Sequence, residues 1–211
     1  LHHRVEVPDG PHRLMVQPLG DGEVRILGVS AERPGSGVIV DSIGIRGRQA
    51  RSWLRWDTTL FQQSMRALRP DMVVLVYGTN EAADSSYAMD RYAADLRAVL
   101  RRMRAATPDV ACVLAGPTDR VKKVGDDRYG VWGRTAEVAR IQRQVAPEFG
   151  CAFWDWQAAM GGEGSILAWR MQQPPLSSAD YIHLTQRGYE LSAERFLGAV
   201  GDAAARTAVG R

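Results

Sequence analysis

Over most of the chain, continuous apolar runs that are typical of buried strands alternate with stretches in which apolar residues recur at helical spacing. Continuous apolar runs of six residues at Met72–Tyr77 and Val110–Ala115 are typical of parallel strands that are covered on both faces. Apolar residues at helical spacing dominate Tyr87–Ala106. Similar patterns predict helices at 61–68, Thr135–Pro147 and Thr185–Val200, a short strand at Cys151–Trp154 and a charged surface loop at 120–132. This alternation predicts an α/β fold, with a parallel sheet between two layers of helices.

The first 40 residues lack this alternation and have a β pattern instead. Arg13–Gln17 and Glu23–Val29 are strand-like, Val38–Val40 is a third apolar stretch, and no helical pattern lies between them. We therefore expect a β-strand segment over residues 1–40 and an α/β domain over residues 41–211.

Composition narrows the classes of function. The chain has 211 residues, of which 45% are apolar, and no apolar run approaches the ~18 residues of a membrane span. Only two of the 27 basic residues are lysines, and the arginines are scattered over predicted helices, so we expect no nucleic-acid surface. The chain begins without Met and without a signal-peptide pattern, as a processed chain or a fragment does, so its compartment cannot be read from a targeting signal.

The two cysteines fit neither a metal site nor a disulfide framework. Cys112 and Cys151 both lie near the starts of predicted strands, which favours buried thiols, with a single bridge between neighbouring strands as the alternative. No Cys/His cluster, calcium loop, P-loop or dinucleotide motif is present, so we expect no metal and no cofactor.

A candidate catalytic pair lies near the C-terminus. Asp180 precedes His183 by three residues, a spacing at which the carboxylate can accept the Nδ1–H of the imidazole. The carboxylate then fixes the tautomer and leaves Nε2 free to act as a base. His183 is also the only histidine after residue 12.

Two further candidates follow predicted strands. Asn80 comes just after Met72–Tyr77, and Gly47 lies in a glycine-punctuated loop after Val38–Val40. The amide of Asn80 and the backbone N–H of Gly47 can both donate to a developing oxyanion. The alternative is that Asn80 caps the next helix and Gly47 only turns the chain.

Together these stretches resemble the SGNH (GDSL-type) hydrolases. Ile43-Gly-Ile-Arg-Gly47, Gly78-Thr-Asn80-Glu81 and Asp180-x-x-His183 are similar to blocks II, III and V of that family, in the same order. The resemblance covers about residues 41–200 and implies a flavodoxin-like, three-layer αβα fold and ester hydrolysis by a serine nucleophile. It implies His183 as the base, Asp180 as its orienting partner, and Gly47 and Asn80 as oxyanion donors. Glu81 replaces the usual aspartate of block III, a departure from which we expect little effect.

The family's nucleophile motif, Gly-Asp-Ser, is absent from the sequence. The nearest match is Asp41-Ser42, which lies only five residues before Gly47, so one loop would have to serve as two blocks. Our preferred interpretation is that residues 1–40 are the last strands of a jelly-roll-like module inserted into the hydrolase. This arrangement resembles the peptidoglycan O-acetylesterase branch. The nucleophile would then lie upstream of Leu1, and the sheet would lack its central strand.

The resemblance implies an acylated small molecule or polysaccharide as substrate. Trp154 and Asp155 lie at the end of the last predicted strand, where an aromatic side chain can stack on a sugar. Core packing is the favoured interpretation of Trp154, and for Asp155 a place in the pocket and a surface role are equally open. We predict a serine esterase that removes O-acetyl groups from a carbohydrate or peptidoglycan, which would place it in the periplasm or outside the cell. The alternatives are a lipase-like or thioesterase-like hydrolase and a non-catalytic carbohydrate-binding module. The sequence does not indicate an oligomeric state.

Overall fold

The computed structural model describes residues 4–26, 28–33, 35–126 and 128–209. It contains two units, Leu1–Gly44 and Ile45–Arg211. In the described residues of the first unit, no helix and no strand is present. The strands expected at Arg13–Gln17, Glu23–Val29 and Val38–Val40 are therefore not formed there, and residue 27 lies outside the described residues. An extended segment becomes a strand only when a neighbour accepts its hydrogen bonds and covers one face.

The second unit is built on a parallel sheet of three strands. β1 (Met72–Val76) pairs with β2 (Ala111–Ala115), and β2 pairs with β5 (Ala152–Trp154), so the strand order is β1-β2-β5. The register places Val74 beside Val113 and Leu114 beside Phe153. All three strands confirm the sequence prediction to within a residue.

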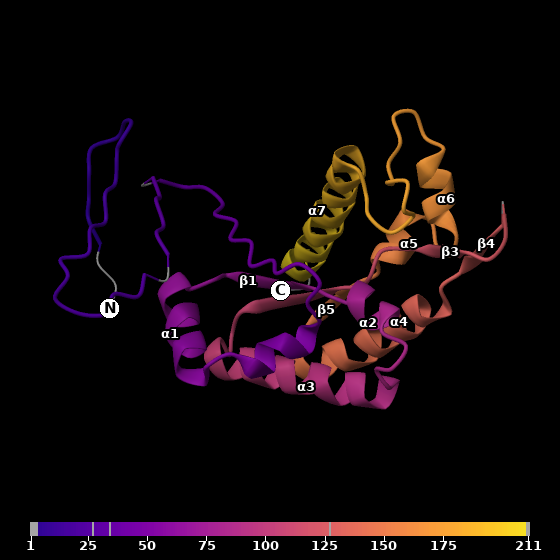
Figure 1. Ribbon diagram of the computed structural model, residues 1–211, viewed down its shortest axis with the longest axis horizontal. Helices are drawn as coiled ribbons and strands as arrows, with labels where there is room; N and C mark the ends of the chain where they lie inside the picture. The colour runs from indigo at the N-terminus through magenta and orange to yellow at the C-terminus, as the bar shows by residue number, and fades with distance from the viewer. Residues whose placement is uncertain (1–3, 27, 34, 127, 210–211) are drawn as a thin grey trace. The chain divides into compact units, whose positions relative to one another are not determined.

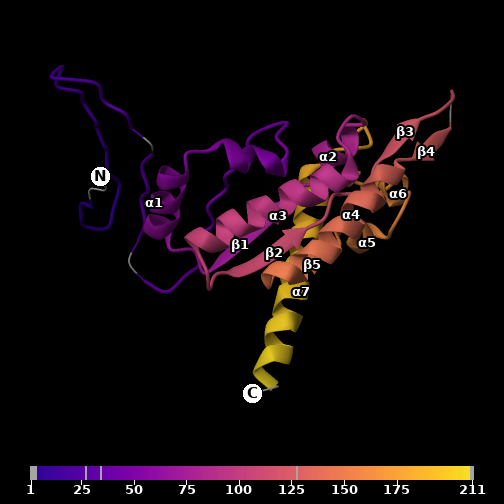
Figure 2. The same cartoon turned by 90° about the horizontal axis from the view of Figure 1, so that it is seen from below.

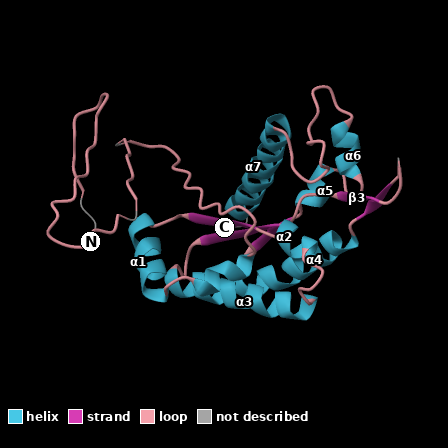
Figure 3. Cartoon of the chain, viewed as in Figure 1, coloured by secondary structure: helices cyan, strands magenta, loops and turns pink. Residues whose placement is uncertain are grey.

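Helices lie on both sides of this sheet (Figures 1 and 3). One side carries η1 (Ala50–Arg55), α1 (Thr58–Leu68), α3 (Met89–Ala106) and α4 (Gly133–Val145), which is followed by the short η2 (Ala146–Phe149). Figure 2 shows α3 and α4 side by side across that face. The other side carries α7 (Gln186–Val209). Neighbouring residues of β5 mark the two faces: Phe153 packs on the main core, whereas Trp154 makes an edge-to-face contact with Phe196 of α7.

Strand β1 is less covered than its apolar sequence predicts. Leu75 is 3% exposed and lies in the main core, but Met72, Val74 and Val76 are 40%, 36% and 55% exposed. These alternate residues share one face of the strand. β1 is also an edge strand of its sheet. The expectation of a strand covered on both faces is therefore wrong for β1, which has one open face and one unpaired edge among the described residues.

The segment expected as a surface loop at 120–132 is instead a β-hairpin. β3 (Val121–Lys123) pairs antiparallel with β4 (Tyr129–Val131). Val121 joins a second small core beneath α5 (Trp156–Met160) and α6 (Ser165–Arg170). The remaining helix, α2 (Thr79–Ala83), begins where β1 ends.

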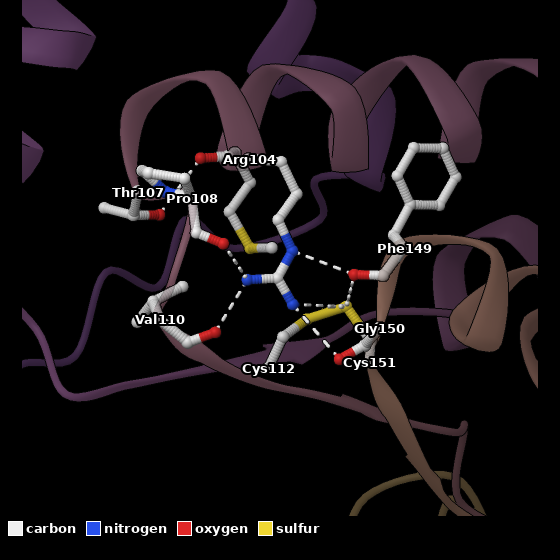
Figure 4. Close-up of a disulfide and its surroundings, with 9 residues drawn as sticks. Arg104, Thr107, Pro108, Val110, Cys112, Phe149, Gly150 and Cys151 are labelled. Carbon is white, nitrogen blue, oxygen red and sulfur yellow. Dashed lines mark hydrogen bonds between the residues drawn. A yellow bond between two sulfur atoms is a disulfide. The ribbon is translucent and has the colours of Figure 1, made fainter.

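Cys112 and Cys151 form a disulfide between neighbouring strands, so the favoured interpretation of two buried thiols is wrong. Parallel pairing of β2 with β5 brings the two Cα atoms to 4.6 Å, which lies within the range that a disulfide spans. Figure 4 shows the guanidinium of Arg104 beside the bridge, where it donates to the carbonyl oxygens of Phe149, Val110 and Gly150. Among the helices that the structure describes, none combines the length and the apolarity that crossing a membrane requires.

Candidate active site

Three polar residues of the second unit follow the ends of the strands, at the carboxyl edge of the sheet. Asn80 lies four residues after the end of β1, Arg120 lies five residues after β2, and Asp155 directly follows β5. Because the three strands are parallel, their carboxyl ends meet at one edge, which is where open α/β sheets place their sites.

Asp180 and His183 form the predicted pair. Oδ2 of Asp180 lies 2.6 Å from Nδ1 of His183, while Oδ1 accepts the backbone N–H groups of His183 and Ile182, both at 3.0 Å. Burial favours the neutral carboxyl, but these hydrogen bonds and the His183 charge outweigh burial and lower the pKa of Asp180 to about 2. The His183 side chain is 65% exposed, so Nε2 can meet a substrate from solvent.

The loop that carries this pair is fixed on both sides. Ser177 and Leu184 form an isolated antiparallel bridge, and the carbonyl oxygen of His183 accepts the N–H of Ser178 at 2.8 Å. Leu184 is 5% exposed and anchors the loop in the second core. Tyr181, between the paired residues, has a φ of 55°, and its ring packs on Tyr129 of the hairpin with centroids 4.6 Å apart.

The two predicted oxyanion donors lie on neighbouring segments, Gly47 in a turn and Asn80 in the first turn of α2. Nδ2 of Asn80 donates to the carbonyl oxygen of Arg48, the residue after Gly47, at 2.9 Å. An amide NH₂ has two hydrogens, so the second remains for a substrate oxygen. Gly47 has a φ of 71°, which only glycine adopts readily, and Arg48 closes its turn by donating to Ile45.

Sequence reasoning missed Arg120, which lies between the two halves of the site. Nη1 donates to the carbonyl oxygen of Thr79 at 3.3 Å, and the guanidinium stacks 4.3 Å above the ring of Trp132. Arg120 is only 6% exposed, and its Nε has no hydrogen-bond partner. Burial lowers the pKa of Arg120, and the charge of Asp180 partly offsets this effect. Its position after a strand end is the signal that could have identified it.

The other three candidates have separate surroundings. Asp155 caps α5 by accepting the N–H of Ala158 at 2.9 Å and pairs with Arg143. Trp154 packs between Trp156 and Phe196. Ser42 is exposed and belongs to the unit Leu1–Gly44, outside the unit that holds the other candidates, so its role stays a prediction.

Comparisons with known proteins agree on one family. The family model described as the GDSL-like lipase/acylhydrolase family matches residues 21–191. A peptidoglycan O-acetylesterase is 26% identical with a TM-score of 0.70, over 77% of this chain and 45% of that protein. This chain therefore spans less than half of that relative.

Two more distant structures show the fold alone. An acetyl xylan esterase is 20% identical with a TM-score of 0.55, over 74% of this chain and 78% of that one. A carbohydrate esterase of family 3 from Talaromyces cellulolyticus is 16% identical with a TM-score of 0.54, over 74% and 68% of the two chains. No curated protein sequence matches the chain.

Proposed function

This chain belongs to the GDSL-like lipase/acylhydrolase family. We propose that it is part of a serine esterase that removes O-acetyl groups from a carbohydrate. The observation that carries the proposal is the Asp180–His183 pair, with 2.6 Å between Oδ2 and Nδ1, in a chain that also holds Asn80 against the Gly47 loop. The carbohydrate is inferred from the peptidoglycan O-acetylesterase to which the chain is similar.

Each residue has a defined role in the proposed reaction. A serine hydroxyl attacks the acyl carbonyl and Nε2 of His183 takes its proton, while Asp180 stabilises the imidazolium. The N–H of Gly47 and the amide of Asn80 donate to the tetrahedral oxyanion. The imidazolium returns its proton to the leaving alcohol, and His183 then activates water to release acetate.

We infer that the serine reaches the site on a strand paired along the open edge of β1, not from Ser42. β1 ends at Val76, four residues before Asn80, so a parallel neighbour would end beside Val76 and deliver its next residue to the same edge of the sheet. The open face of Met72, Val74 and Val76 has the apolar character that such a segment would cover.

Labelling with a fluorophosphonate probe, followed by peptide mass spectrometry, tests both the esterase proposal and the proposed origin of the serine. The proposal expects no adduct on the folded chain, and a serine adduct that depends on His183 in a longer protein that contains it. An adduct on Ser42 that disappears in His183→Ala would overturn the strand-pairing inference but retain the esterase. Absence of His183-dependent labelling in any form, together with binding of an acetylated polysaccharide, would favour the binding module instead.

We also propose an oxidising compartment, the periplasm or the cell exterior, for this protein. The support is the Cys112–Cys151 disulfide, because such bonds persist where thiols are not kept reduced. Labelling of free thiols in rapidly quenched cells checks this: both cysteines should be blocked in the native protein and become reactive only after reduction.

A further inference from the structure

Glu81 is fully buried in a position where the sequence suggested little importance. Its side chain is 0% exposed, and each carboxylate oxygen accepts a backbone N–H. Oε1 accepts from Ala50 at 2.7 Å, and Oε2 accepts from Gly78 at 3.0 Å. Burial raises the pKa of Glu81, and the bonds from Ala50 and Gly78 and the nearby charge of Arg51 act against this effect. The carboxylate therefore depends on these two donors for its solvation.

A helix cap explains only one of these bonds. Glu81 occupies the third position of α2, and a glutamate there commonly accepts the N–H at the N-cap, which here is Gly78. The bond to Ala50 spans 31 residues of sequence and joins a different element, the first residue of η1. A residue that served only to cap α2 would not reach it.

The two segments joined in this way carry the two oxyanion donors. Ala50 lies three residues after Gly47, and Gly78 lies two residues before Asn80. The same junction is reinforced by Gln49, whose Nε2 donates to Asp84 at 3.1 Å, and by the Asn80–Arg48 bond at 2.9 Å. Of these contacts, only Glu81 holds both segments by charge-assisted bonds to the backbone.

We propose that Glu81 is a positioning residue that sets the separation between the Gly47 N–H and the Asn80 amide. This inference rests on the proposed function, since the donors matter only to an enzyme that stabilises an oxyanion. The catalytic value of such donors depends on their placement before the reaction begins, and a displacement of about 1 Å can cost about 10²-fold in rate.

Glu81→Gln is the first test. Glutamine keeps the shape, but its NH₂ must face one of the two backbone N–H groups, so one bond is replaced by a donor–donor contact. In the esterase-competent protein, we expect kcat for p-nitrophenyl acetate to fall about 10²-fold, with KM within about twofold. Asp95→Asn is the matched control, because Asp95 is also a buried carboxylate, but its hydrogen bonds come from the side chains of Tyr87 and Arg91 and not from the backbone of the donor segments.

Ala50→Pro is a second variant that leaves Glu81 in place. Ala50 is the first residue of η1 and Gln49 before it has φ −97° and ψ 157°, so the backbone before the site suits a proline, which removes the donated N–H. We expect the same selective loss of kcat as in Glu81→Gln. This variant keeps the inference testable if the glutamine variant does not fold.

An NMR measurement on the present chain separates this inference from the esterase proposal. The Gly47 amide and the Asn80 side-chain NH₂ signals should shift in Glu81→Gln and Ala50→Pro and stay in place in Asp95→Asn. Unmoved signals, or a loss of thermal stability with unchanged kcat, would overturn the positioning role. If no form of the protein hydrolyses esters but the signals shift, the proposed function fails and the geometric role of Glu81 stands.

Discussion

Asp180 holds His183 at two points, through Nδ1 of the ring at 2.6 Å and through the backbone N–H at 3.0 Å. One carboxylate therefore fixes both the ring tautomer and the loop beneath it. In Asp180→Asn, the amide can still accept the backbone N–H, but its NH₂ next to Nδ1 favours the tautomer with a protonated Nε2. In the esterase-competent protein, we expect kcat to fall about 10³- to 10⁴-fold in an acetate-release assay, while the variant stays folded.

Glu190→Gln is the control for this variant. Glu190 is a surface carboxylate on α7 that pairs with Arg187, and its removal should leave kcat within about twofold. An Asp180→Asn enzyme with the rate of the wild type would remove Asp180 from the mechanism.

The ionisation of Asp180 should depend on His183. The pKa of Asp180 is lowered from 3.8 to about 2, so its contribution to folding is present above about pH 4 and is lost as the pH falls toward 2. In His183→Ala the side-chain hydrogen bond is removed, and the pKa should rise toward 3.8. Carboxyl ¹³C titration of both proteins measures this change, and an unchanged midpoint would contradict the observed pairing.

The disulfide should stabilise the second unit. Cys112 and Cys151 are 39 residues apart, and closing a loop of that size contributes about 4 kcal/mol through the entropy of the unfolded chain. Cys112→Ala/Cys151→Ala should lower the denaturation midpoint accordingly. In the esterase-competent protein it should leave kcat unchanged, because the bridge lies near the starts of β2 and β5, at the end of the sheet opposite to the carboxyl edge. Denaturant titrations of the oxidised and the double-alanine proteins test this, and equal midpoints would show that the bridge is not formed.

Sequence patterns predicted the features that depend on residues close together in the sequence. Met72–Tyr77 and Tyr87–Ala106 have strand and helix patterns long enough to identify each element, and Asp180 and His183 are close enough in sequence for their pairing to be inferred. The helical prediction at Thr185–Val200 fell short of α7, which continues to Val209 because alanines sustain a helix without an apolar stripe.

Features that depend on contacts distant in sequence were not predictable. The hairpin over 120–132 is polar and gains its stability from Val121 in the second core and Tyr129 against Tyr181. The disulfide requires knowledge that β2 and β5 are neighbours. The importance of Glu81 rests on a bond to Ala50, and no local pattern around Glu81 indicates that partner.

We expect Arg120 to support the active site without adding to the stability of the folded chain. A buried guanidinium whose Nε has no partner is costly, and replacing such a charge with an apolar side chain of similar length is often neutral or stabilising. We therefore expect Arg120→Met to change the unfolding free energy of the chain by less than about 1 kcal/mol. In the esterase-competent protein it should lower kcat about tenfold, because Thr79 beside Asn80 loses its support. A variant that is strongly destabilised, or fully active, would refute this trade of stability for function.

The open face of β1 gives the most direct test of how the sheet is completed. Val74 is 36% exposed and Leu75 is 3% exposed, although they are neighbours in one strand. Val74→Lys should therefore change the stability of the isolated chain by less than about 0.5 kcal/mol, whereas Leu75→Lys should unfold it. An uncharged, apolar edge also favours pairing between copies, so Val74→Lys should reduce association measured by light scattering.

In a protein that supplies the serine strand, the same lysine would be placed beneath the covering segment and should reduce esterase activity. Val74→Lys that unfolds the isolated chain as Leu75→Lys does would mean that this face is already covered. The serine would then have to reach Asn80 and His183 by a route other than the edge of β1, and Ser42 would replace the upstream serine as the leading candidate.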